Sequence, residues 1–539
     1  MSNIPDPILE GLQRGWKVLG GKHGALPERI TCDVAIIGSG AGAGITAELM
    51  TKAGLNVLII EEGQLRSSSN FKQREPEAYA SLYQEGGGRK TKDNSILIYQ
   101  GRSVGGSTTV NWTSSFRTPA ATLQVWQDRF GLKDYNPQAL APYFAQAEKR
   151  LNIGPWLTPS NENNDILLRG ATKLGFHSGA ILRNVKGCYN LGSCGMGCPT
   201  NAKQSMLVTT IPFALDQGAT LLVETRAERF EISNGRITGI QCIAVKTNSE
   251  PVNTAQPATQ IIAKHYILAG GSINSPALLL RSHAPDPHKV LGKRTFLHPA
   301  TMSVGFMPTT VAGWAGAPET VYTDHFLETH PIDGPIGFIL ETTPMHPVFF
   351  GSNLPGFGET QADAFRRFPN ASSIVAIMRD GFNEHASGGS VELRSDGSPV
   401  LDYPVNDFVL DGARRAFLAM TQIQFEAGAT SVQVGHELAK RTSSWAETKA
   451  TIDALPMKPY LTRIGSAHVM GGCGLADDEK RGVTRPDGVH WQLENLSIHD
   501  GSIFPTSIGA NPQLSIYGNV NRLAQGLVKR LTGKDVVLA

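Results

Sequence analysis

Two polar side chains near the C-terminal end have the types that the oxidation of an alcohol needs. His468 lies among glycines in the segment Ser466 to Cys473, and Asn511 stands before Pro512. Such a reaction requires a base for the hydroxyl proton, a hydride acceptor beside the carbon and a hydrogen-bond partner for the oxygen. Histidine titrates near neutral pH and suits the first task. The chain has 14 histidines, and it is the glycine-flanked setting that singles out His468.

A glycine-rich turn near the N-terminal end predicts a dinucleotide site. The turn follows an apolar run that begins at Cys32 and precedes a helical pattern, which is the context of the Gly-x-Gly-x-x-Gly/Ala fingerprint. Its glycines permit a tight turn and the close approach of a pyrophosphate to a helix N-terminus. The turn alone does not distinguish a nicotinamide from a flavin dinucleotide. The residues assigned to this cradle are Gly38, Ser39, Gly40, Gly42, Ala43 and, for a ribose hydroxyl, Glu61.

A second glycine loop occupies residues 101–111 and combines three glycines with hydrogen-bonding side chains. Such a loop brings backbone amides close to a ligand that larger side chains would obstruct. A mobile surface turn is the alternative, and the arginine, hydroxyls and asparagine disfavour it. The residues expected to bind a cofactor here are Arg102, Gly105, Gly106, Ser107 and Asn111.

Three of the six cysteines, Cys188, Cys194 and Cys198, lie within 11 residues in the segment 186–206. Thiolates at such spacing hold iron–sulfur clusters in some proteins, often with a proline after the last cysteine. Zinc would need a fourth ligand, and the loop contains no histidine. Free thiols in a glycine-rich loop are the third interpretation, and the sequence leaves all three open.

The elements that must position these residues indicate an α/β fold. The strand pattern from Cys32 to Gly38, the helical pattern at 42–53 and the buried run at 56–60 form a β-α-β unit, which implies a parallel sheet. Strand-like runs recur from 298 to 460, together with a helix at 411–427, and indicate a second, sheet-containing lobe. We expect mostly loop at 64–130 and a C-terminal helix at about 520–531. The predicted domains are an irregular or helical N-terminal lead-in at 1–31, a Rossmann-like cofactor domain at 32–297, a substrate-binding lobe at 298–460 and a return to the cofactor domain at 461–539.

Composition excludes several classes of protein. The formal net charge of the 539-residue chain is +2, which argues against a nucleic-acid or anionic-membrane partner. Six cysteines are too few for a disulfide-built scaffold. No apolar stretch is long enough for a transmembrane helix, and the first residues lack the pattern of a signal peptide. We expect a cytoplasmic protein, with export on a partner subunit as the alternative.

These motifs resemble the glucose-methanol-choline (GMC) flavoprotein oxidoreductases. The resemblance rests on Gly38-x-Gly40, on Glu61 followed closely by a glycine, on the loop at 101–111, and on the segment Ile267 to Leu280, in the family's order. It implies an FAD-binding domain of the GMC type with a substrate lobe. It also implies non-covalent FAD, because Val110 stands where some members attach the flavin through a histidine.

The resemblance also implies roles for individual residues. His468 would be the proton acceptor, and Asn511 the partner of the substrate oxygen and of the flavin. Asp500 matches the aspartate that precedes the flavin's pyrimidine-facing turn, and Ala227 and Pro512 join the cofactor-binding set. His298 matches a family position outside the chemistry and is interpreted as structural.

The implied activity is FAD-dependent oxidation of an alcohol CH–OH group to a carbonyl, with oxygen, a quinone or a cytochrome as electron acceptor. The Gly-Gly-Cys473 ending is similar to cholesterol oxidases, and the cysteine loop is similar to long-chain alcohol oxidases and to iron–sulfur sugar dehydrogenases. A sugar or polyol dehydrogenase with a small or cytochrome partner subunit, a flavin-bound lyase and a non-enzymatic flavin-binding subunit are the alternatives. An apolar alcohol is slightly favoured by residues that core packing explains equally well: Met345, Phe349, Phe350, Phe357, Met378 and Phe382.

Overall fold

A β-α-β unit starts the larger of two main sheets in this computed structural model, which describes residues 4–246, 250, 252 and 258–538. Strand β2 (Arg29–Ile37) leads through a glycine turn into helix α2 (Ala41–Lys52), and strand β3 (Val57–Ile60) returns beside β2. The two strands pair in parallel. Their buried residues are almost all β-branched or leucine, as expected for a strand covered on both faces.

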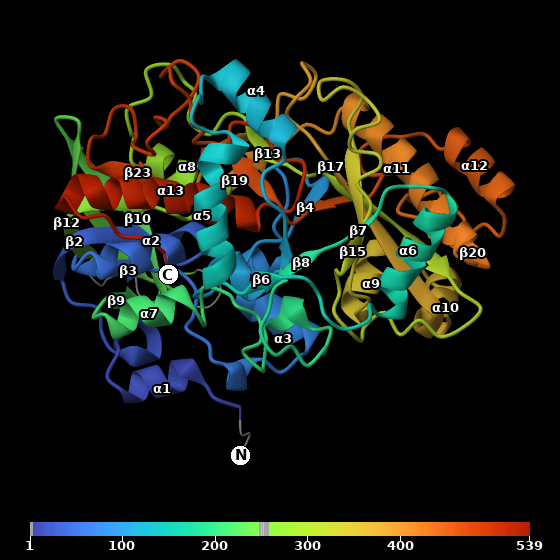
Figure 1. The fold of residues 1–539 in the computed structure, drawn as a ribbon, viewed down its shortest axis with the longest axis horizontal. Coiled ribbons are helices and arrows are strands. Elements are labelled where there is room, and N and C mark those ends of the chain that lie inside the picture. Colours follow the sequence, from blue (N-terminus) through green and yellow to red (C-terminus); the bar gives the residue numbers. More distant parts are fainter. Residues whose placement is uncertain (1–3, 247–249, 251, 253–257, 539) are drawn as a thin grey trace.

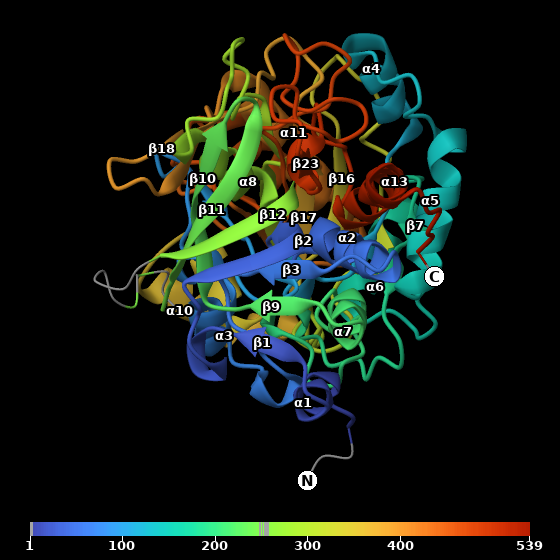
Figure 2. The same cartoon turned by 90° about the vertical axis from the view of Figure 1, so that its left-hand side faces the viewer.

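The larger sheet has eight strands and joins distant parts of the chain. The other members are β1 (Lys17–Leu19), β9 (Thr220–Leu222), β10 (Thr225–Ser233), β11 (Arg236–Ala244), β12 (Thr259–Leu268) and β23 (Leu496–Ile498). Their order is β1-β9-β3-β2-β12-β11-β10, with β23 also paired to β12, and Figure 2 shows this succession. Strand β1 belongs to the lead-in that the sequence predicted to be irregular or helical, and it is held by parallel pairing with β9.

Helix α13 (Gln513–Thr532) packs against α2 and against α5 (Pro137–Arg150), beside the larger sheet (Figure 1). Close packing of α2 depends on its small residues. A Cβ atom on Gly42 would lie 1.7 Å from the backbone oxygen of His499, and one on Gly44 would collide with the side chain of Met206. Gly42, a glycine of the predicted cradle, therefore also lets the C-terminal part of the chain pack closely against α2.

The second sheet forms the other lobe. Its strands are β4 (Ile96–Ile98), β14 (Ala300–Phe306), β16 (Phe338–Thr342), β17 (Ala371–Met378), β20 (Ser431–Val434) and β21 (Ile464–Ser466). The order is β16-β17-β14-β21-β4, and β20 also pairs with β14. Helix α11 (Asp407–Glu426) packs on this sheet and against α6 (Glu162–Lys173) and α12 (Trp445–Ala454), on the right of Figure 1. Strands β4 and β21 come from outside the range 298–460 that the sequence predicted for this lobe.

Shorter elements make up the rest of the described fold. The remaining helices are α1 (Pro7–Gln13), α3 (Glu75–Leu82), α4 (Ala120–Phe130), α7 (Thr210–Asp216), α8 (Gly271–Arg281), α9 (Pro347–Asn353) and α10 (Glu359–Arg366). The remaining strands are β5 (Ser114–Ser115), β6 (Ile153–Gly154), β7 (Gly179–Ala180), β8 (Leu182–Asn184), β13 (Thr295–Leu297), β15 (Val321–Tyr322), β18 (Ser390–Leu393), β19 (Pro399–Asp402) and β22 (Val469–Gly471). The sequence predicted mostly loop at 64–130, where α3 and α4 are in fact helical.

The C-terminal helix is longer than the pattern at 520–531 predicted. It begins directly after Pro512, so its first turn carries Gln513 into the interior. Among the described residues, no helix combines the length and the apolar character that crossing a membrane requires.

Candidate active site

A cavity of about 1210 Å³ lies between the two lobes and collects most of the residues that the sequence singled out. Its walls come from the turn after β2, the loop at 101–113, the start of α8 and the segments before β22 and α13. The predicted residues that line it are Gly38, Ser39, Gly40, Gly42, Glu61, Gly106, Ser107, Asn111, Ala227, His468, Asp500, Asn511 and Pro512.

The two glycine loops touch each other at the cavity. Gly38 has φ +106°, and a Cβ there would lie 2.3 Å from the backbone oxygen of Ala269. A Cβ on Gly106 would lie 2.8 Å from the Cα of Gly40. No side chain caps the N-terminus of α2 at Gly40, so its first N–H groups are available to a phosphate.

Glu61 and Ser39 connect these two loops. The Ser39 hydroxyl donates to Glu61 at 2.5 Å and accepts from the Gly105 N–H at 3.0 Å. The other Glu61 oxygen accepts from the Gly63 N–H at 2.7 Å. Burial raises the pKa of Glu61 to about 7. Glu61 directly follows β3, the second strand of the β-α-β unit. This is the position at which the dinucleotide fingerprint has its acidic residue for a ribose hydroxyl.

Three predicted cofactor residues do not line the cavity. Ala43 is fully buried in α2, and Gly105 faces Ser39. Arg102 donates to the Glu62 carboxylate at 3.0 Å and to the backbone oxygen of Lys246 at 3.1 Å. The structure gives these three residues supporting positions behind the cavity wall.

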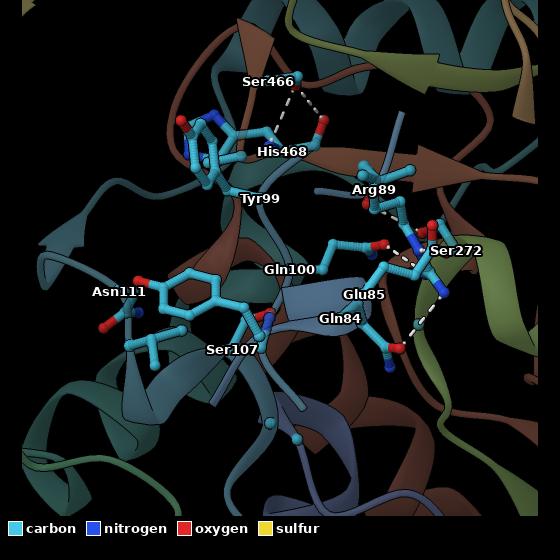
Figure 3. Close-up of a pocket in the computed structure, with 18 of the residues that line it drawn as sticks. Gln84, Glu85, Arg89, Tyr99, Gln100, Ser107, Asn111, Ser272, Ser466 and His468 are labelled. Atoms are coloured by element: carbon cyan, nitrogen blue, oxygen red, sulfur yellow. Dashed lines mark hydrogen bonds and ion pairs between the residues drawn. The ribbon is translucent and has the colours of Figure 1, made fainter. Parts of the chain in front are cut away.

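His468 stands at the start of β22, and its imidazole faces a second imidazole. Its Nδ1 lies 3.0 Å from Nδ1 of His298, and the rings are nearly perpendicular. Burial lowers the pKa of His468 to about 4, so the ring is neutral at pH 7. The backbone of His468 is hydrogen-bonded to the Ser466 hydroxyl, as Figure 3 shows, and the residue lines the cavity. His298, which the family resemblance implied to be structural, thus contacts the candidate catalytic histidine directly.

Asn511 is held by a buried carboxyl group that no sequence motif indicated. Its Nδ2 donates to Glu341 at 3.1 Å, while its own Oδ1 is buried without a hydrogen-bond partner. Glu319 lies beside Glu341 and accepts from the Ser114 hydroxyl. Burial raises the pKa of both carboxyls, that of Glu319 to about 7. A glutamate inside the apolar run of β16 was the available signal for this pair.

Asn111 and Asp500 complete the polar side of the cavity. The Asn111 Nδ2 donates to Gln513 at 2.6 Å, and its Oδ1 is buried without a partner. Asp500 accepts from the N–H groups of Gly271 and Ser502, each at 2.8 Å, and thereby fixes the starts of two helical turns. Buried polar atoms without partners are uncommon and often mark the position of a missing ligand.

A group of contacting aromatic rings, here called the aromatic wall, also lines the cavity. The rings of Tyr79, Tyr83, Tyr99, Phe349 and Trp112 contact one another in sequence. Of the six apolar residues proposed for the substrate, Phe349 alone lines the cavity among the described residues, whereas Phe357 is exposed and the other four are buried in the core.

A buried guanidinium at the cavity edge was also missed. Arg89 donates to Glu85 at 3.0 Å, to Gln100 at 2.9 Å and to Gln84 at 3.3 Å, and Figure 3 shows the four side chains converging. All four residues lie within 64–130, a stretch that the sequence predicted to be mostly loop.

The cysteine loop at 186–206 is tied to the second glycine loop at 101–111. Among the described residues, no three histidine, cysteine or acidic side chains converge as metal ligands, so the iron–sulfur prediction for Cys188, Cys194 and Cys198 has no support. Instead, the buried ammonium of Lys203 donates to three backbone oxygens, those of Thr109, Asn111 and Cys194, at 2.7–2.8 Å.

Comparison with known proteins identifies the family. Two models of the GMC oxidoreductases match the chain, one over residues 79–300 and the other over residues 385–519, together more than half of its length. The chain belongs to the GMC oxidoreductase family. It is thus an FAD-dependent oxidoreductase that acts on CH–OH donors.

Relatives and solved structures agree with this assignment. The chain is 27% identical to a long-chain-alcohol oxidase of Arabidopsis thaliana, across 99% of this chain and 72% of the relative. It is 29% identical to an uncharacterized GMC-type oxidoreductase of Mycobacterium tuberculosis, across 94% and 77% of the two chains. Its fold is similar to that of formate oxidase of Aspergillus oryzae, with a TM-score of 0.69 and 15% identity across 94% of this chain and 99% of the oxidase. It is also similar to that of a pyridoxine 4-oxidase, with a TM-score of 0.67 and 16% identity across 92% of this chain and 98% of that enzyme.

The residues present fit FAD. The glycine turn before α2, the Glu61 carboxyl and the unpartnered oxygens of Asn111 and Asn511 lie along one continuous cavity. A Cβ atom on Gly38 or Gly106 would push apart the backbone segments that form the cradle, so these glycines keep the two loops in the close arrangement that the fingerprint requires for a pyrophosphate.

Proposed function

We propose that this GMC oxidoreductase oxidises an apolar alcohol to the corresponding carbonyl compound, with His468 and Asn511 at the substrate oxygen and with non-covalently bound FAD. The observation that carries the proposal is that both side chains line the same cavity as the glycine cradle. FAD, when bound, supplies the acceptor for the hydride that leaves the alcohol carbon. Val110 lines the cavity where a histidine would be needed for a covalent flavin bond.

The protein supplies the polar groups for the oxygen end of the reaction. Burial keeps the pKa of His468 low, and its imidazole is therefore neutral at physiological pH. A neutral imidazole can accept the hydroxyl proton, as the sequence suggests, or donate a hydrogen bond to the oxygen. Its role depends on which ring nitrogen carries the proton. Asn511 is held by Glu341 through its amide nitrogen, which leaves the amide oxygen facing the site.

An apolar substrate is supported by two independent points. The aromatic wall of Tyr79, Tyr83, Tyr99, Phe349 and Trp112 supplies apolar ring surface, which is the usual lining of a site for an apolar ligand. Several curated relatives are named long-chain-alcohol oxidases. Their names also favour oxygen as the electron acceptor. The sugar-dehydrogenase alternative depended on a cluster in the cysteine loop, which lacks a converging ligand set among the described residues.

The test is an absorption spectrum of the purified holoprotein before and after anaerobic addition of an alcohol. We expect bleaching of the oxidised flavin by a long primary alcohol and recovery on admission of oxygen. A lyase on the same fold turns over without net reduction, so an unbleached spectrum with every alcohol offered would contradict the proposal. Bleaching by sugars alone would favour the dehydrogenase alternative.

A further inference from the structure

The environment of His468 determines more than its charge. His298 is almost fully buried, and its Nδ1 faces Nδ1 of His468 at 3.0 Å. On its other side, Nε2 of His298 is 3.1 Å from the backbone nitrogen of Gly509. The two histidines are therefore the last members of a hydrogen-bonded chain that starts at a backbone N–H group.

A backbone N–H can only donate, and this fixes the position of every proton along the chain. Nε2 of His298 must accept from Gly509, so the proton of a neutral His298 resides on Nδ1. That proton is donated to Nδ1 of His468, which must then be the unprotonated nitrogen of its ring. The proton of a neutral His468 is left on Nε2. This Nε2 has no hydrogen-bond partner among the described residues, and His468 lines the cavity.

The positions of all three groups are set by the surrounding backbone. Strands β13 and β22 pair with Leu297 opposite Val469, and the His298 N–H donates to the backbone oxygen of His468 at 3.3 Å. Gly509 has φ +78°, and a Cβ there would lie 2.6 Å from the Arg379 side chain. Only glycine fits this turn, which aims the amide at His298.

Burial keeps both imidazole rings neutral. The pKa of His298 is lowered first by burial and then by the neighbouring His468 and Arg379. The opposite tautomer would put the His298 proton on Nε2, against the Gly509 N–H. Two donors would then face each other, and one hydrogen bond would be lost in a buried site.

We propose that His298 and the Gly509 N–H fix the tautomer of His468, so that its Nε2–H points into the cavity and donates a hydrogen bond to the substrate oxygen. The proposal rests on the proposed function and refines it. His298 is a positioning residue, and in the resting enzyme His468 binds the substrate oxygen as a donor. This differs from the proton-acceptor role that the sequence suggests.

The direct test is ¹⁵N NMR of the oxidised holoenzyme with ¹⁵N-labelled histidine at neutral pH. The His468 signals are assigned by their absence in His468→Gln. We expect a protonated Nε2 and an unprotonated Nδ1 for His468. The reverse pattern, or a proton shared evenly between the two nitrogens, would overturn the proposal. This measurement needs no substrate, so it stands apart from a failure to find an alcohol that reduces the flavin.

Two variants of nearly equal size test the role of His298. In His298→Asn the amide Nδ2–H replaces the imidazole Nδ1–H as a donor, whereas in His298→Asp a carboxylate can only accept. We expect the asparagine variant to keep the wild-type tautomer and to reduce its flavin within about threefold of the wild-type rate. The aspartate variant should move the proton of His468 to Nδ1 and slow flavin reduction about tenfold or more.

The tautomer and the rate must change together in the aspartate variant. An unchanged tautomer, or an inverted tautomer with the wild-type rate of flavin reduction, overturns the proposal. A merely structural role for His298 predicts similar losses in both variants. The difference between asparagine and aspartate is therefore the decisive readout.

Discussion

Replacement of His468 by alanine removes the imidazole from the cavity but leaves the glycine cradle intact. We expect the variant to retain FAD and to be reduced by alcohol 10²- to 10⁴-fold more slowly, the usual contribution of a positioned proton-transfer or hydrogen-bonding group (about two to four orders of magnitude). Anaerobic stopped-flow absorbance measures this rate. His330→Ala, at an exposed histidine, is the control. An unchanged rate in His468→Ala would remove the residue from the mechanism.

The buried carboxyl pair predicts a pH dependence of stability. The pKa of Glu319 is raised to about 7 by burial, above that of an unfolded chain, so its contribution favours the folded state at low pH and is lost as the pH rises from about 4.5 through 7. The free energy of unfolding of the wild type should therefore decrease between pH 5 and pH 8. In Glu319→Gln, which lacks this carboxyl, the decrease should be smaller by about 1–3 kcal/mol.

Urea unfolding of the holoprotein at the two pH values measures this difference. Glu384→Gln, at an exposed glutamate, is the matched control and should follow the wild type. Identical pH dependence in Glu319→Gln and the wild type would mean that the pair ionises without penalty.

For individual residues, the sequence indicated those that belong to local motifs. It did not indicate residues whose place in the site depends on contacts between distant parts of the chain. Gly38 and Glu61 belong to one short β-α-β unit, so their spacing is visible in the sequence. His298 and His468 are 170 positions apart and meet only because β13 pairs with β22. Glu341 contacts Asn511 across a similar separation.

Among the elements, α2 makes the tightest approach to its neighbours. A methyl group on Gly42 would overlap the backbone oxygen of His499, and backbone yields less readily than a side chain. We expect Gly42→Ala to lower the melting temperature and to lose FAD during purification. Flavin absorbance relative to protein and thermal unfolding measure the two effects.

Gly526 in α13 provides the matched control. A Cβ at this helix position meets nothing within 4 Å. Gly526→Ala should keep FAD and be neutral or stabilising by about 0.5–1 kcal/mol, because alanine favours helices over glycine. Equal behaviour of the two variants would show that the close packing of α2 is unimportant.

The sequence predicted elements with strong local patterns and misjudged those that need partners. Strands β2 and β3 and helix α11 lie close to their predicted ranges. Strand β1 has three residues, and its strand conformation depends on pairing with β9. Helices α3 and α4 were missed because the stretch from 64 to 130, which has glycine clusters at 86–88 and 101–106, shows no clear apolar periodicity.

For the whole molecule, the aromatic wall predicts a preference among substrates. Each methylene group that an alcohol buries contributes about 0.8 kcal/mol, or about a fourfold gain in kcat/KM. We expect kcat/KM to rise along a series of primary alcohols until the chain outgrows the cavity, and to be far lower for polyols of equal length. Steady-state rates along the series measure this. A flat series would argue for a polar substrate.

The overall architecture followed from the family resemblance more than from the strand patterns. The β-α-β unit and the C-terminal motif established an α/β fold, but the chain's path between lobes was not visible in the sequence. Pairing partners such as β4 with β21 combine segments more than 350 residues apart, and no local pattern specifies them.

The repeated crossing of the chain between the two sheets limits how a substrate can enter the cavity. Among the described residues, the chain passes from the larger sheet to the smaller one between β3 and β4, returns before β9, passes again between β12 and β14, and returns between β21 and β23. A hinge motion that parts the lobes would have to bend four connections at once. Admission of an alcohol and release of its product should therefore proceed by local displacement of short segments at the cavity mouth, with the two sheets staying fixed relative to each other.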